Sequence, residues 1–222
     1  MINDHLNSAV VMLPAAMLAA ALVYLPIFFI RRKRNPVFLL ARHAADYIFL
    51  GCCAMLSQVV FGWATVSPVP KEHFVNLDLF KTFREAYYEG NKISSIQIML
   101  NILMFLPFGF LLPVVFPKKM NSFSRICAVV LTVTVMIEAM QYFIGRVADV
   151  SDVVTNFAGG LCGFSIYVML YMRYKDEPSF SRICTGRLRL PVLSGPLSIG
   201  IITITLVAPI AVNTVLFALR GK

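Results

Sequence analysis

The 222-residue chain is poor in charged side chains. Lys, Arg, Asp and Glu make up 14% of its residues, whereas a soluble domain carries about 25%. Too little polar surface remains to cover a water-exposed sphere of this size, and this excludes an ordinary soluble protein. The apolar fraction of 59% and the mean hydropathy of +0.77 indicate instead that the natural solvent of the chain is lipid.

Metal-binding and redox motifs are also lacking. The three histidines are scattered, and the five cysteines form no CxxC pair. We therefore expect no metal site and no cofactor, with the cysteines acting as small apolar packing residues. The net charge of +9 does not indicate a nucleic-acid partner, because the basic residues form short clusters between apolar runs. Such clusters set membrane topology and contact anionic headgroups, so membrane lipids are the expected partners.

Long apolar runs are what the chain has in abundance. A transmembrane helix needs about 20 mostly apolar residues. Runs of this kind lie near residues 9–30, 46–66, 94–116, 126–144, 150–172 and 192–218. They predict an all-α fold, a polytopic integral membrane helical bundle of about six transmembrane helices, which forms a single membrane domain over residues 1–222. Pro196 and Pro209 predict that the last span is a kinked or re-entrant helix.

The basic residues predict the orientation of this bundle. With the N-terminus outside, the inner segments hold thirteen Lys and Arg residues and the outer segments hold seven. This bias places both termini outside. The long outer stretch 67–93 carries Leu77, Phe80, Arg84 and Tyr87 at helical spacing, which predicts an amphipathic helix along the outer interface.

Polar residues recur on one face of three consecutive spans, each time in the outer half. In the third span Asn101 shares a face with Ser94 and Gln97. Farther along this span, Pro107, Gly109 and Pro113 are expected to interrupt the helix. In the fourth span Thr134, Glu138 and Gln141 share a face, and Arg146 follows at the outer boundary.

The fifth span has the tightest alignment, because its polar residues and its glycines fall within an arc of about 100°. The polar members are Asp149, Asp152 and Asn156, and the glycines are Gly159, Gly160 and Gly163. Glycine on such a stripe allows a neighbouring helix to approach closely. If the three spans pack together, seven side chains converge into a candidate ligand-binding site: Asn101, Glu138, Gln141, Arg146, Asp149, Asp152 and Asn156.

The same residues also have a purely structural interpretation. Asp149 and Asp152 can cap the fifth helix, with Arg146 paired to one of them. Asn101, Gln141 and Asn156 can form interhelical hydrogen bonds worth about 0.6 kcal/mol each. Glu138 fits this interpretation least well, because a carboxyl group at that depth must be neutral or paired.

Three fragments in order carry a family resemblance. They are NILMFLPFGF at 101–110, EAMQ at 138–141, and RVADVSDVVTNFAGG at 146–160, closed by Gly163. The chain resembles the VanZ-like family of bacterial membrane proteins over residues 75–165, with the first and sixth spans outside this core. It departs at Leu79, where the family often has a proline before the third span.

The resemblance implies a multi-pass protein of the bacterial cytoplasmic membrane that lowers sensitivity to lipoglycopeptides such as teicoplanin. No settled biochemical activity comes with the family. We therefore weigh three hypotheses. In the first, a non-enzymatic envelope protein binds a lipid-linked cell-wall precursor or a lipoglycopeptide at the polar cluster.

The second hypothesis is a membrane enzyme acting on lipid-linked substrates, with Glu138 as base or with Asp149 and Asp152 holding a divalent cation. The third is a transporter that uses Glu138 as a proton-linked carboxylate. Against the third hypothesis, the inner half of every span is expected to be nearly free of polar residues, so no continuous polar route is visible. The sequence gives no indication of oligomeric state.

Overall fold

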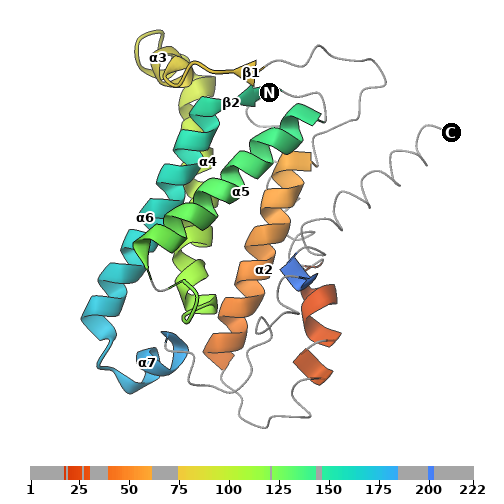
Figure 1. The fold of residues 1–222 in the computed structure, drawn as a ribbon, viewed down its shortest axis with the longest axis vertical. Coiled ribbons are helices and arrows are strands. Elements are labelled where there is room, and N and C mark those ends of the chain that lie inside the picture. The colour runs from red at the N-terminus through yellow and green to blue at the C-terminus, as the bar shows by residue number, and fades with distance from the viewer. Residues whose placement is uncertain are drawn as a thin grey trace, which may run out of the picture.

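The computed structural model is mostly helical (Figure 1). The structure describes residues 18, 20–26, 28–30, 40–61, 75–120, 122–143, 147–184 and 200–202. The side chains of residues 40–42, 58–61 and 182 are not among those described. Arg146 and all of the predicted sixth span apart from residues 200–202 also lie outside the described residues.

Three described helices are long and apolar enough to cross a membrane. They are α4 (Lys92–Val115), α5 (Phe123–Phe143) and α6 (Val150–Tyr174), of 24, 21 and 25 residues. At 1.5 Å per residue each is more than about 30 Å long, which matches the hydrocarbon core of a bilayer. These helices correspond to the predicted third, fourth and fifth spans, so the prediction of a helical membrane protein is confirmed.

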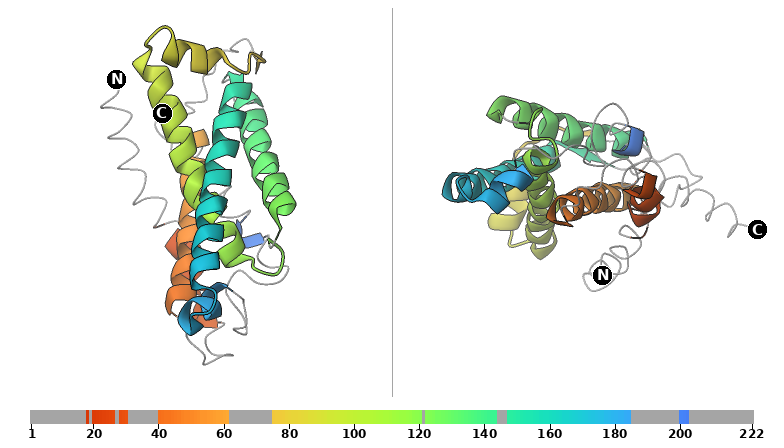
Figure 2. Two further views of the ribbon diagram at one scale, coloured as in Figure 1. Left: turned by 90° about the vertical axis from the view of Figure 1, so that its left-hand side faces the viewer. Right: turned by 90° about the horizontal axis from the view of Figure 1, so that it is seen from below.

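A fourth long helix, α2 (Leu40–Phe61), packs against α4 on the side away from α6 (Figures 1 and 2). Its Phe49 stacks on Phe108 of α4, with ring centroids 5.6 Å apart, and meets Phe116 edge-on. The apolar core lies between these helices and includes the buried Phe105, Leu112 and Ile126. The sequence predicts the second span over residues 46–66, and α2 begins six residues before that range.

The α4–α6 pair has the most extensive helix–helix contact among the described elements. Their backbones touch where glycines face each other. A Cβ added to Gly109 would lie 1.9 Å from the carbonyl oxygen of Gly160, and one added to Gly163 would lie 1.9 Å from that of Leu106. Only glycine, which has no Cβ, permits this approach.

The predicted interruption of the third span at Pro107, Gly109 and Pro113 is wrong, because α4 is one helix through both prolines. The prolines remove hydrogen bonds to the carbonyl groups four residues earlier, but in lipid there is no water to compete for the backbone. Phe108, Gly109, Leu111 and Leu112 are also buried in this stretch, so packing holds the helix in place.

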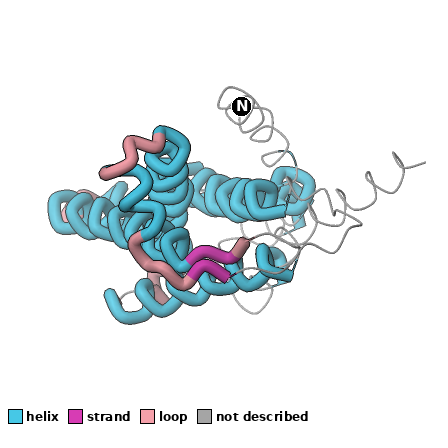
Figure 3. Tube along the Cα trace, turned by 90° about the horizontal axis from the view of Figure 1, so that it is seen from above, coloured by secondary structure: helices cyan, strands magenta, loops and turns pink. Residues whose placement is uncertain are grey.

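A short polar cap covers one end of the three long helices (Figures 1 and 3). It contains the helix α3 (Lys81–Tyr87) and two unpredicted strands, β1 (Val75–Asn76) and β2 (Ala148–Asp149). The strands pair in parallel, with Val75 opposite Ala148 and Asn76 opposite Asp149. At the opposite end of the bundle lies α7 (Pro178–Cys184).

Within the stretch expected to form an amphipathic helix, α3 covers seven residues. Leu77 and Phe80 precede it rather than belonging to it. Both remain exposed, as do Tyr87 and Tyr88, so the cap carries apolar side chains on its outside.

Candidate functional site

The candidate site begins at Asp149, the residue that caps the N-terminus of α6. Its Oδ1 accepts a hydrogen bond from the backbone N–H of Ser151 at 2.8 Å, and its Oδ2 accepts one from Asn76 Nδ2 at 2.8 Å. Its own backbone N–H donates to Oε2 of Glu138 at 2.9 Å. Asp149 therefore connects β1, α5 and α6, and it satisfies one of the open N–H groups of the helix end.

One turn farther along α6, Asp152 faces α4. Gln97 Nε2 donates to both of its oxygens, at 3.0 and 3.1 Å, and Asn101 Nδ2 donates to Oδ1 at 2.9 Å. Asn101 Nδ2 also reaches Thr155 Oγ1 at 3.1 Å, and that hydroxyl donates to the backbone carbonyl of Asp152. Two amides thus hold one carboxylate between the helices, with hydrogen bonds to a charged group that are stronger than neutral ones.

Glu138 and Gln141 lie on the buried face of α5, with 6% and 9% of their surface exposed. Glu138 is five residues before the end of the helix, a depth of about 7.5 Å along the axis. With its amide nitrogen turned toward Glu138, Gln141 donates to both carboxylate oxygens, at 3.1 and 3.2 Å. Because Glu138 also accepts from the backbone of Asp149, the carboxylates of Glu138 and Asp149 belong to one network, whereas Asp152 binds the amides of α4.

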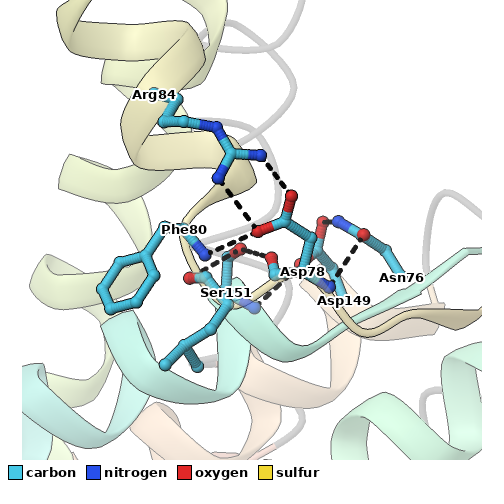
Figure 4. A network of polar contacts seen from close by, with 7 residues as sticks. Asn76, Asp78, Phe80, Arg84, Asp149 and Ser151 are labelled. Atoms are coloured by element: carbon cyan, nitrogen blue, oxygen red, sulfur yellow. Dashed lines mark hydrogen bonds and ion pairs between the residues drawn. The ribbon is translucent and has the colours of Figure 1, made fainter.

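The turn that leads from β1 into α3, residues 76–80, closes the network on its outer side (Figure 4). The hydroxyl of Ser151 reaches the carbonyl oxygens of Asp78 and Leu79, at 3.1 and 3.2 Å. The Asp78 carboxylate forms an ion pair with Arg84 and accepts the backbone N–H of Phe80 at 3.1 Å. The guanidinium of Arg84 lowers the pKa of Asp78, and Asp78 in turn raises the pKa of Arg84.

This turn forms with Leu79 at the position where the pattern that the sequence resembles often has a proline. Asn76 Oδ1 accepts the backbone N–H of Asp78 at 3.2 Å, and Asp78 accepts that of Phe80 in the same way. Short polar side chains that bond to the backbone two residues on stabilise such turns. A backbone hydrogen bond from Lys81 to the Asp78 carbonyl, at 3.2 Å, completes the turn.

Below this network, two buried oxygen atoms have no hydrogen-bond partner among the described residues. They are Oγ1 of Thr134 on α5 and Oδ1 of Asn156 on α6. Their residues are 0% and 4% exposed. Buried polar atoms are nearly always paired, so this arrangement requires an explanation.

The structure places five of the seven residues of the predicted site in two hydrogen-bonded groups. Asn101 contacts Asp152. Glu138 contacts the backbone of Asp149 and accepts hydrogen bonds from the side-chain amide of Gln141. Asn156 is buried but outside the hydrogen-bond network, and Arg146 lies outside the described residues. Ser94, on the same stripe as Asn101, bonds instead to Glu85 of α3, at 2.8 Å.

Sequence reasoning missed several members of the network: Asn76, Asp78, Ser151 and Thr155. Thr155 carried a usable signal, because it lies one helical turn after Asp152. The others depend on the pairing of two-residue strands, which leaves no periodic pattern.

Sequence reasoning also missed Asp46 in α2, whose side chain is fully buried. It lies one turn from His43, whose Nδ1 is 2.6 Å from the hydroxyl of Tyr24. Asp46 and His43 lie in the first half of α2, which is the half nearest α7 (Figure 1). With the predicted orientation this end belongs to the inner half of the second span, so α2 departs from the expectation of a nearly apolar inner half. An acidic residue beside an apolar run was the available signal.

No group of three or more His, Cys, Asp and Glu residues that could hold a metal ion occurs in the part of the chain described. All five cysteines are free thiols, with Cys53 and Cys184 buried and Cys162 exposed.

The fold and the network define a class of protein, a helical membrane protein with an acid and amide cluster at one end of its bundle. The chain belongs to the VanZ/LLP1 family, whose family model matches residues 18–171. The match begins within the first apolar run, well before the resemblance seen at 75–165. No curated protein and no solved structure matches the chain.

Proposed function

We propose that this protein acts in the cytoplasmic membrane of a bacterium and lowers sensitivity to lipoglycopeptide antibiotics such as teicoplanin. It does so by binding an amphiphilic ligand, either a lipid-linked cell-wall precursor or the antibiotic, at its outer polar network. The observation that carries the proposal is the continuity of that network. It runs from the exposed Asp78 and Arg84, through Ser151 and Asp149, to the buried Glu138.

The orientation is part of the proposal: six spans, a kinked or re-entrant last helix, and both termini outside. Basic residues at the end of the bundle opposite the cap support it. Lys118 and Lys119 follow α4, Arg125 lies in the first turn of α5, and Arg173 lies in the last turn of α6. Basic residues favour the cytoplasmic side, so the cap with β1, β2 and α3 faces outward.

The composition of the site suits a ligand that has both polar and apolar parts. Carboxylates and amides of α4, α5 and α6 can bind amide, amine and sugar groups. Arg146, in the connection 144–146 between α5 and β2, would bind phosphate or carboxylate. The exposed Phe80, Tyr87 and Tyr88 of the cap are aromatic side chains of the kind that favour a membrane interface, and this suits a ligand with an acyl chain.

The test is antibiotic susceptibility of a sensitive bacterial host that expresses the protein. We expect the wild type to raise the inhibitory concentration of teicoplanin at least severalfold and Asp152→Asn to abolish that rise. Asp176→Asn, an exposed substitution between α6 and α7, is the matched control and should behave as wild type. Immunoblots of membrane fractions must show equal amounts of all three proteins.

A glycopeptide without an acyl chain serves as the second drug, and its inhibitory concentration should change less. Equal teicoplanin susceptibility with and without the wild-type protein would refute the proposed function.

A further inference from the structure

The two unpartnered oxygens belong to Thr134 on α5 and Asn156 on α6, two helices that are in contact. The two helices run in opposite directions and are in contact, crossing at an angle (Figures 1 and 2). At one level a Cβ on Gly160 would lie 2.5 Å from Cγ1 of Val130. One turn toward the cap, the corresponding pair is Thr134 and Asn156.

A second contact of α5 lies nearer the cap. Four residues beyond Thr134 is Glu138, and its Oε2 is 2.9 Å from the backbone nitrogen of Asp149, the residue that caps α6. Thr134 lies on the same face of α5 as Val130 and Glu138, both of which contact α6. Asn156 lies on the same face of α6 as Gly160, which contacts α5. Both side chains therefore point into the interface between two fixed contacts.

We propose that Thr134 Oγ1 and Asn156 Oδ1 bind a small monovalent cation of the sodium class between α5 and α6. Hard cations take oxygen ligands, and a hydroxyl and an amide carbonyl are both suitable. One turn toward the cap, Glu138 follows Thr134 and Asp152 follows Asn156, so each unpartnered oxygen has a carboxylate on its own helix beside it. Their negative charge favours a cation at this position over a neutral molecule.

The proposed site also lies on the less tightly packed side of α6. On the α4 side, backbone meets backbone at Gly109, Gly159 and Gly163, and even a methyl group would clash. On the α5 side, Gly160 meets the side chain of Val130 instead. Side chains rather than backbones therefore meet between α5 and α6, and the unpartnered Thr134 and Asn156 are on these two helices.

This inference goes beyond the proposed function and does not depend on any antibiotic or precursor. A binding cation stabilises the folded state in proportion to its occupancy, so thermal unfolding reports it without an activity assay. The experiment uses the full chain in lipid nanodiscs at constant ionic strength, in sodium, potassium or choline chloride. We expect sodium to raise Tm by about 3 °C over choline, saturably.

Three variants localise the effect. Thr134→Val has nearly the same shape but lacks the hydroxyl, and it should abolish the sodium response while Tm in choline stays unchanged or rises. Thr134→Ser keeps the hydroxyl and should retain the response. Thr132→Val, two residues away on the exposed face of α5, is the matched control and should also retain it.

Two results would overturn the proposal. Equal Tm in all three salts would mean that a bridging water satisfies the two oxygens. A full sodium response in Thr134→Val would place any ion site elsewhere. Loss of antibiotic protection in a cell assay bears on neither outcome, so failure of the proposed function can be distinguished from failure of this one.

Discussion

The face of α6 that packs on α4 and the face that packs on α5 differ in how they hold the neighbouring helix. Toward α4, glycines bring the backbones into contact, and the described polar bonds lie near the cap, at Asp152 and Thr155. Toward α5, side chains separate the helices, and Thr134, Glu138 and Asn156 are buried between them. Lipid tails are as apolar as the helices, so association depends on close packing or on buried polar contacts. α6 relies mainly on the first with α4 and mainly on the second with α5.

The largest effect should come from breaking the close-packed face. Gly163→Ala would place a methyl group 1.9 Å from the carbonyl oxygen of Leu106, a backbone atom that cannot move without displacing α4. We expect a loss of more than about 3 kcal/mol in the free energy of unfolding, beyond ordinary overpacking. Unfolding in detergent, followed by circular dichroism, measures it.

Two other glycines calibrate that loss. Gly160→Ala meets the side chain of Val130 rather than a backbone atom, so it should cost less, about 1 to 2 kcal/mol. Gly200→Ala meets nothing within 4 Å and should be neutral or slightly stabilising. If Gly163→Ala were no more harmful than Gly200→Ala, the backbone contact between α4 and α6 would be disproved.

An intermediate effect should follow from Asp152→Asn at the outer end of the α4 face. The substitution removes the charge that accepts hydrogen bonds from Gln97 and Asn101, and the new amide can accept only with its single oxygen. We expect a loss of about 2 kcal/mol, as for hydrogen bonds to a charged group. The same unfolding measurement applies, with Asp176→Asn as the exposed control.

An unchanged stability in Asp152→Asn would mean that the amides find other partners. Asp152 would then have no structural role and could serve a ligand. The α4 face of α6 would in that case be stabilised by its glycines alone.

The parts of this arrangement that follow a helical period could be predicted from the sequence. Hydropathy located α4, α5 and α6, and the 100° phase placed Asn101 on the polar face of α4 and Asp152 on that of α6. The glycines fell on the same stripe for the same reason, since a helical face repeats every three to four residues. These predictions needed no knowledge of how the helices are arranged.

The parts that depend on contacts distant in sequence could not be predicted. Asn76 meets Asp149 through a strand pair of two residues, too short for any alternation to be visible. The continuity of α4 through Pro107 was also misjudged, because the sequence shows the missing N–H but not the neighbours that hold the helix. Asp46 was missed since it lies at the edge of the apolar run rather than within it.

The smallest effect should come from the cap, where Asp78 and Arg84 are exposed and screened by solvent. Arg84 lowers the pKa of Asp78 below its usual value of 3.8. A lowered pKa in the folded state gives stability that is present above the unfolded value and is lost as pH falls through the folded one. Protonation of Asp78 below about pH 4 should therefore loosen the turn that docks on Ser151.

Thermal unfolding between pH 5 and pH 3 tests this contribution. The wild type should lose slightly more Tm over this range than Arg84→Gln, whose Asp78 has no guanidinium to keep it ionised. Lys119→Gln, at the opposite end of the bundle, is the matched control and should follow the wild type. Added salt should shrink the difference, because the pair is at the surface. If the Arg84→Gln profile were identical to the wild type at low salt, the cap would be held without the ion pair, by the bonds of the Ser151 hydroxyl and the β1–β2 pairing, and the polar network would end at the helix rather than at the surface.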